Sequence, residues 1–164
     1  MLETPRLLLR DFEVADVDPL YEIQGDQNVM RYTFWAESRE QCAAHLQAYA
    51  DSRKNHGFAP WTVVLKAENR VIGWGGLGID PHAPNWGPEV VYFLHPDYWG
   101  QGFASEVVAV SLEHGFGSLG LERIGAFARP ENEASIRVLK KAGFLFRRYE
   151  PALGRNHYEI STSV

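Results

Sequence analysis

The stretch that decides the fold is Glu89-Val90-Val91-Tyr92-Phe93-Leu94-His95-Pro96-Asp97-Tyr98-Trp99-Gly100-Gln101-Gly102-Phe103-Ala104. Its first six residues are apolar, β-branched or aromatic apart from Glu89, which predicts a strand buried on both faces. His95-Pro96-Asp97 ends that strand, and from Gly102 to Gly117 the apolar residues recur at helical spacing. The order is therefore strand, tight glycine turn, helix.

The glycine turn is a candidate anion site because it opens a helix. Backbone N–H groups in the first turn of a helix have no partner within the helix, and at the positive end of its dipole they suit a pyrophosphate. Glycine at positions 100 and 102 lets a phosphate approach the amides and permits a positive φ. A plain strand-to-helix turn explains the same residues equally well, so the turn alone leaves both interpretations open.

Nucleotide motifs do not explain the glycines. The turn has Ser105 where a dinucleotide motif has its third glycine, and it lacks the Lys-Thr or Lys-Ser of a nucleotide P-loop. A second cluster, Gly73 to Gly78, has the three-glycine pattern, but the proline-rich segment 79–84 after it cannot form a phosphate-binding helix. We interpret these glycines as residues that let a strand bend or lie close to a neighbour.

Strands and helices are predicted on both sides of the deciding stretch. Strands are expected at residues 6–10, 61–65, 70–74, 123–127, 144–149 and 157–163, and further helices at residues 16–24, 38–57 and 132–142. Asn132 is a good N-cap for the last of these helices, and Gly143 is placed to end it. This order predicts an α+β fold with a mixed, mostly antiparallel central sheet and helices on both faces.

Composition limits the function classes. With 164 residues, 45% hydrophobic and 23% charged, the chain can form a packed core, and we expect one domain over residues 1–164. A formal net charge of -5 does not favour a nucleic-acid partner. No signal peptide and no stretch of ~20 apolar residues is present, so a soluble cytoplasmic protein with no membrane partner is expected. The six histidines lack metal-ligand spacing, so no metal is expected.

Two motifs together resemble the GNAT acetyltransferase superfamily, and the RimJ/RimL-type protein N-acetyltransferases within it. The first is the run from Tyr92 to Ala104, and the second, about thirty residues later, is Asn132-Glu133-Ala134-Ser135-Ile136-Arg137-Val138-Leu139-Lys140-Lys141-Ala142-Gly143-Phe144. The opening Glu3-Thr4-Pro5-Arg6-Leu7-Leu8-Leu9-Arg10 also looks like that branch. One departure is Trp99, because the superfamily often has Arg or Gln at that position.

The resemblance implies a GNAT fold and acetyl-coenzyme A as cosubstrate. In that fold the strand 89–94 parts from its parallel neighbour 123–127, and the pantetheine arm lies in the gap. Its amides can pair there with unpaired backbone groups, and the resemblance places these contacts at Phe93 and Leu94. The remaining coenzyme contacts that it implies are Trp99, Gly100, Gln101, Gly102, Phe103, Ala104, Asn132 and Ser135.

The catalytic candidates are Glu89 and Ser135. An ammonium substrate must lose a proton before it can attack a thioester, and a carboxylate with a raised pKa can accept that proton. Glu89 opens the apolar strand, where many family members have a glutamate, although a solvated strand-end carboxylate is the simpler explanation. Ser135 corresponds to a family position near the coenzyme sulfur, and a residue that shares the Asn132 cap is an equal alternative.

The acceptor has no diagnostic motif. The regions expected to shape its site are residues 34–60, the loop 80–88 and the tail after Tyr149, with Trp35, His56, Trp86 and His157 as candidates. A protein N-terminus and a small-molecule amine both stay open, as does a homodimer. The alternative function is a coenzyme A-binding sensor or interaction module that has lost turnover on the same fold.

Overall fold

The computed structural model describes residues 1–162, so Ser163, the expected end of the last strand, lies outside them. Within these residues the chain forms an eight-stranded sheet in the order β1-β2-β3-β4-β5-β6-β8-β7. The strands are β1 (Leu2–Glu3), β2 (Leu7–Arg10), β3 (Trp61–Leu65), β4 (Arg70–Gly78), β5 (Glu89–Leu94), β6 (Arg123–Ala128), β7 (Leu145–Glu150) and β8 (Arg155–Ser161). Among the strands of residues 1–162 only β5 and β6 are paired in parallel, so the mixed, mostly antiparallel sheet is confirmed.

Four α-helices accompany the sheet in the described part of the chain. They are α1 (Val17–Gln24), α2 (Arg39–His56), α3 (Phe103–Glu113) and α4 (Glu133–Ala142). Short 3₁₀ turns are η1 (Val14–Asp16), η2 (Pro84–Trp86) and η3 (Pro96–Tyr98), and a π turn, η4 (His114–Ser118), continues α3. None of the described helices is both long and apolar enough to span a membrane.

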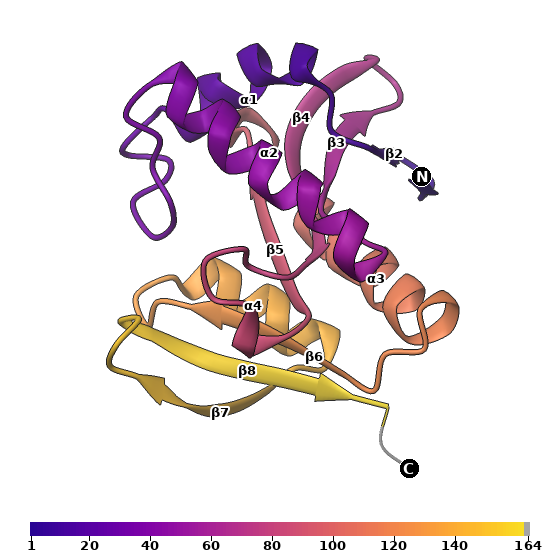
Figure 1. Ribbon diagram of the computed structural model, residues 1–164, viewed down its shortest axis with the longest axis vertical. Coiled ribbons are helices and arrows are strands. Elements are labelled where there is room, and N and C mark those ends of the chain that lie inside the picture. Colours follow the sequence, from indigo (N-terminus) through magenta and orange to yellow (C-terminus); the bar gives the residue numbers. More distant parts are fainter. Residues whose placement is uncertain (163–164) are drawn as a thin grey trace.

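The helices form two layers, one on each face of the sheet (Figure 1). Helices α1 and α2 enclose one core with Trp74 and Phe93, while α3 and α4 enclose the larger core with residues such as Ile72 and Leu94. Phe93 and Leu94, which are neighbours in β5, point into different cores because side chains alternate across a strand. Ile72 and Trp74 are two residues apart in β4, and they lie in different cores because the register of β4 against β3 shifts at this point. The predicted burial of β5 on both faces is confirmed.

Local signals set the ends of the helices as expected. The Ser38 side chain accepts a hydrogen bond from Gln41 N–H at the start of α2, and Asn132 caps α4, which ends at the left-handed Gly143. The glycine cluster 73–78 lies within β4, which runs four residues beyond its expected end. A Cβ at Gly76 would lie 2.3 Å from the Trp61 ring, so close packing accounts for this cluster.

Candidate active site

Strands β5 and β6 separate almost as soon as they meet. They are paired only at Glu89 and Gly125 within residues 1–162, where Gly125 N–H donates to the Pro88 carbonyl at 2.9 Å. In Figure 1 β5 passes from the half of the sheet formed by the earlier strands to the half formed by β6, β7 and β8. Beyond Glu89, this edge of β5 faces a gap instead of a neighbouring strand.

The register of β4 against β5 decides which backbone groups of β5 face that gap. His95 N–H donates to the Ile72 carbonyl at 2.7 Å, and in an antiparallel ladder such bonded pairs alternate with unbonded ones. The N–H and C=O of Phe93 therefore point to Trp74 of β4, whereas those of Tyr92 and Leu94 point into the gap. Phe93 was expected to offer its backbone to a ligand in the gap. This does not fit the ladder, because the backbone N–H and C=O of Phe93 face β4.

The glycine turn has the backbone conformation that its sequence suggests. Gly100 and Gly102 have φ of +71° and +85°, and Gly102 is the N-cap of α3. The Trp99 indole N–H donates to the Leu94 carbonyl at 2.8 Å, which ties the turn to the end of β5. The Gln101 side chain donates to the Asp97 carbonyl at 3.0 Å, and Gln101 does not line the cavity.

Helix α4 approaches the gap from the far side. Ser135 N–H donates to the Asn132 carboxamide oxygen at 3.2 Å, so the capping explanation for Ser135 is correct for its backbone. Its hydroxyl lies 3.1 Å from the Tyr92 hydroxyl, which bridges β5 and α4. Burial raises the pKa of Tyr92, while the hydrogen bond to Ser135 opposes the shift. Tyr92 therefore stays a phenol at neutral pH.

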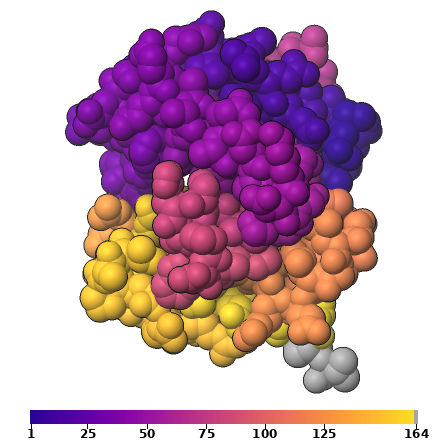
Figure 2. All heavy atoms as spheres, in the orientation of Figure 1, coloured from indigo at the N-terminus to yellow at the C-terminus, as the bar shows by residue number. Residues whose placement is uncertain are grey.

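A cavity of about 1180 Å³ connects the glycine turn, the gap and the α1–α2 layer. Its lining at the glycine turn and at the start of α4 includes Trp99, Gly100, Gly102, Phe103, Ala104, Asn132 and Ser135. In Figure 2 the pink segment before β5 lies between the purple α2 region and the yellow C-terminal strands. Trp86 of that segment packs edge-on against Phe127 at 5.0 Å, so the segment covers part of this region.

Glu89 lies in this cavity with its carboxyl group almost out of solvent. The residue is 6% exposed. Burial raises its pKa to about 8, with Asp80 adding to the shift and Arg155 opposing it. Asp97, the nearest alternative acid in the sequence, has a side chain 74% exposed and does not line the cavity. Of these two carboxylates, Glu89 is therefore the one that lies in the cavity.

The side of the cavity next to α1 and α2, where the acceptor was expected, is largely aromatic. The Phe34 and His45 rings stack at 4.0 Å, Tyr49 meets Trp74 edge-on at 5.2 Å, and Trp74 stacks on Phe93 at 5.5 Å. All five line the cavity. Burial lowers the pKa of His45 to about 4, so this imidazole is neutral at physiological pH.

The four residues expected to shape the acceptor site lie outside this cavity. Trp35, His56, Trp86 and His157 do not line the cavity. The Trp35 indole instead donates to the Gly25 carbonyl, and Trp86 packs on Phe127 and His157. One signal for the correct face was present, because the cavity-lining residues Gln41, Ala44, His45 and Ala48 follow helical spacing along α2.

Comparison with known proteins shows which family has this arrangement. The model of the GNAT acetyltransferase domain matches residues 6–145, which include the gap, the glycine turn and α4. The chain belongs to the GNAT acetyltransferase family. YoaA of Bacillus subtilis, an uncharacterized N-acetyltransferase, is 34% identical over 88% of this chain and 82% of its own length.

Two solved GNAT structures share the fold at low sequence identity. RimL, a ribosomal L7/L12 alpha-N-protein acetyltransferase in complex with coenzyme A, matches with a TM-score of 0.79 at 19% identity, covering 96% of this chain and 95% of its own. The Vibrio cholerae spermidine N-acetyltransferase, in complex with coenzyme A and spermine, matches with a TM-score of 0.76 at 20% identity, covering 96% of each chain.

Proposed function

We propose that this GNAT chain transfers the acetyl group of acetyl-coenzyme A to a primary amine by direct attack. The observation that carries the proposal is one continuous cavity, which joins the free amides of the glycine turn, the open edge of β5 and the buried Glu89. The anion site and the strand edge suit a long phosphorylated thioester. The buried carboxyl group at the other end of the cavity suits an amine that must lose a proton.

The residues fit the coenzyme in two respects. The left-handed Gly100 and Gly102 leave N–H groups free at the start of α3, which suits pyrophosphate oxygens. The backbone groups of Tyr92 and Leu94 face the gap, where they can pair with pantetheine amides, although the Leu94 carbonyl already accepts from Trp99. Tyr92 therefore replaces Phe93 as our candidate for this backbone contact. A gap-facing N–H of β5 can also stabilise the thioester oxygen as it gains negative charge.

The two proton transfers are assigned to opposite faces of β5. Glu89 takes a proton from the incoming ammonium, directly or through water, and the neutral nitrogen then forms a bond to the thioester carbon. The carbon–sulfur bond breaks, and sulfur leaves with the electron pair. The Tyr92 hydroxyl, held by Ser135, donates the proton that this sulfur takes up. The newly bonded nitrogen releases its second proton to water, from which Tyr92 regains its own. Strand alternation puts Glu89 in the α1–α2 layer and Tyr92 in the α3–α4 layer.

No covalent acyl-enzyme is needed for this route. Cys42, the chain's one cysteine, is fully buried in the α1–α2 core and does not line the cavity. Burial raises its pKa to about 11, which keeps it in the unreactive thiol form at neutral pH. Direct transfer between the two bound substrates is therefore preferred.

Tyr92→Phe is expected to lower kcat about 10–100-fold and to leave the affinity for acetyl-coenzyme A within about threefold. The effect is at or below the usual range for general acids because a thiol leaves readily as its anion. Ser135→Ala should lower kcat by a smaller factor, since Tyr92 keeps its proton and the Asn132 cap uses only the Ser135 backbone. Steady-state kinetics with calorimetric binding tests both variants. A larger loss in Ser135→Ala would transfer the acid role to Ser135.

The acceptor side suits an amine with one positive charge and an apolar body. Aromatic faces attract a cation and pack against apolar groups. Asp80 supplies negative charge there, but Arg31 and Arg155 line the same cavity and would repel a polycation. We therefore favour a monoamine over a polyamine, although one solved relative is named a spermidine acetyltransferase.

Acetyl-coenzyme A binding with an amine panel tests the proposed function. At ~100 times its dissociation constant a ligand adds ~2.7 kcal/mol to the stability of the folded state, which corresponds to a rise in Tm of about 5–10 °C for a chain of this size. NAD and ATP should raise the Tm much less. Among 2-phenylethylamine, spermidine and an alanine-initiated peptide, we expect 2-phenylethylamine to give a kcat/KM at least about tenfold above that of spermidine.

The outcomes separate the competing functions. Binding of acetyl-coenzyme A without transfer to any amine would support the inactive sensor. Absence of binding at millimolar acetyl-coenzyme A would contradict both the enzyme and the sensor. A spermidine value equal to or above that of 2-phenylethylamine would overturn the acceptor preference alone.

A further inference from the structure

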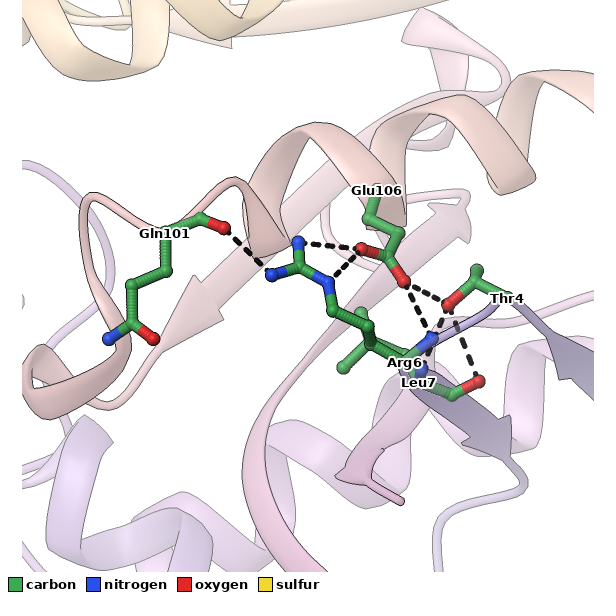
Figure 3. Close-up of polar contacts among 5 residues, drawn as sticks. All are labelled: Thr4, Arg6, Leu7, Gln101 and Glu106. Carbon is green, nitrogen blue, oxygen red and sulfur yellow. Dashed lines mark hydrogen bonds and ion pairs between the residues drawn. The ribbon is translucent and has the colours of Figure 1, made fainter. Parts of the chain in front are cut away.

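Arg6, at the start of the chain, contacts the glycine turn almost a hundred residues later. Its Nη1 donates to the Gln101 carbonyl at 3.0 Å, and its guanidinium pairs with Glu106 of α3 at 2.8 Å through Nε and 2.7 Å through Nη2. The guanidinium carbon also lies 4.1 Å from the centre of the Phe103 ring. Figure 3 shows the Arg6 side chain between the turn and the first turn of α3.

Glu106 is held in turn by the segment that carries Arg6. The Thr4 hydroxyl and Arg6 N–H both donate to Glu106 Oε1, and Leu7 N–H donates to the Thr4 hydroxyl at 2.9 Å (Figure 3). Burial raises the pKa of Glu106, but the hydrogen bonds from Thr4 and Arg6 outweigh it, and the net shift is downward. The carboxylate is therefore charged at neutral pH and fixes the guanidinium from the side opposite Gln101.

The contact with Gln101 determines the direction of an amide. The Gln101 carbonyl and the Gly102 N–H belong to the same planar trans peptide unit, so they point in opposite directions. Arg6 holds the carbonyl, and the Gly102 N–H is therefore directed away from Arg6. Gly102 lines the cavity, and Arg6 does not. The contact thus keeps an amide of the glycine turn available to an anion in the cavity.

Arg6 is poorly placed to bind the phosphate itself. Glu106 neutralises its charge, and both Nε and Nη2 donate to that carboxylate. Its Nη2 lies 3.3 Å from the point that a Cβ at Gly102 would occupy, so the guanidinium packs against the back of the turn. These contacts suit a group that supports the turn from behind.

We propose that Arg6 is a positioning residue for coenzyme binding, which holds the Gln101–Gly102 peptide so that its N–H faces the pyrophosphate. The proposal rests on the proposed function, because it requires the glycine turn to be the pyrophosphate site. It assigns a role to the opening Glu3–Arg10 segment, which lies outside the cavity and takes no part in the proton transfers.

Arg6→Gln is expected to weaken acetyl-coenzyme A binding about tenfold, the loss of roughly one hydrogen bond to a charged group. Affinity for S-acetylpantetheine, which has no pyrophosphate, should stay within twofold. Isothermal titration calorimetry with both ligands at two salt concentrations gives the comparison. The salt dependence of acetyl-coenzyme A binding should match that of the wild type, because Arg6 acts through the turn and not as a phosphate partner.

The Arg147–Glu159 pair supplies a matched control. Its atoms are 2.8 Å apart with side chains 52% and 18% exposed, against 2.7 Å with 44% and 17% for Arg6 and Glu106, but it joins β7 to β8 outside the cavity. Arg147→Gln should therefore leave both affinities unchanged. If Arg6→Gln does not fold, Arg6→Lys allows the same test, because lysine keeps the charge and loses the planar two-sided contact.

Each result points to one conclusion. Wild-type affinity for acetyl-coenzyme A in the Arg6 variant would refute the positioning role, as would an equal loss for both ligands. A weaker salt dependence in the variant would show that Arg6 pairs with phosphate directly. Failure of the wild type to bind acetyl-coenzyme A would instead refute the proposed function on which this role rests.

Discussion

Glu89→Gln is expected to reduce turnover by roughly 10²–10⁴ while acetyl-coenzyme A affinity hardly changes. Glutamine keeps the size and hydrogen bonding of the side chain but cannot take the amine proton. The glutamate is buried beside Asp80, and its pKa of about 8 is matched to proton transfer near neutral pH. Initial rates with a saturating monoamine, together with calorimetric Kd values, separate the rate effect from the binding effect.

The pH dependence of Glu89→Gln gives the sharper result. Wild-type activity should rise with pH until Glu89 is ionised, near pH 8, whereas the variant should gain activity until the free amine itself loses its proton. The deficit therefore shrinks at high pH. Asp97→Asn removes an exposed acid outside the cavity and should stay within twofold of wild type. Rates of Glu89→Gln within about twofold of wild type across pH 6–9 would show that Glu89 is structural.

The same pKa shift predicts a change in stability of known sign. The folded protein raises the pKa of Glu89 from 4.5 to about 8, so folding favours the protonated form. The stability contributed by this group is present below pH 4.5 and is lost as pH rises to about 8. Glu89→Gln should therefore gain stability relative to wild type over this window, by roughly 2–4 kcal/mol at the upper end. Urea unfolding at pH 5 and pH 8 measures the difference.

Gly102→Val is expected to weaken acetyl-coenzyme A binding about 100-fold or more, because it disturbs at least two amide contacts to phosphate. Gly102 has φ of +85°, which a β-branched residue adopts only with strain. A Cβ there would also lie 3.3 Å from Arg6 Nη2 and crowd the support behind the turn. Calorimetry with acetyl-coenzyme A and S-acetylpantetheine should find the loss mainly in the first ligand.

Gly57→Val separates the local strain from the binding effect. Gly57 has φ of +84°, it ends α2, and a Cβ there would meet nothing within 4 Å. The two variants should lose similar stability from backbone strain, but Gly57→Val should keep wild-type affinity for acetyl-coenzyme A. An equal loss of affinity for both ligands in Gly102→Val would refute the pyrophosphate assignment.

Most secondary structure could be predicted because each element carries its own local signal. Runs of β-branched and aromatic residues marked β3 and β5 to the residue, and Ser38 and Asn132 marked the helix starts at their observed caps. The glycine turn was recognisable for the same reason, since a strand, two left-handed glycines and a helix are adjacent in sequence. The parting of β5 from β6 came only from the family resemblance, because pairing between distant strands leaves no periodic pattern.

In the candidate site, too, features within one continuous motif could be predicted, and contacts between distant segments could not. Most residues of the two sequence motifs, 89–104 and 132–135, line one cavity, and they could be proposed from sequence because each motif is continuous. The register of β4 against β5 turns the Phe93 backbone groups toward β4 and those of Tyr92 into the gap, and this register depends on how the two strands meet. The Tyr92–Ser135 contact and the Asp80 and Arg155 charges near Glu89 join separate segments.

The acceptor face and the Arg6 contact depended most on the folded chain. Tyr49 and Trp74 lie in different elements and meet only because α2 packs on β4, and Arg6 reaches Gln101 only because β2 passes behind the start of α3. Turns, caps and strands depend on short-range backbone preferences, so neighbouring residues in the sequence are enough to predict them. Packing between distant segments determines which side chains meet in a cavity. The type of a single residue does not indicate which distant residue it will contact.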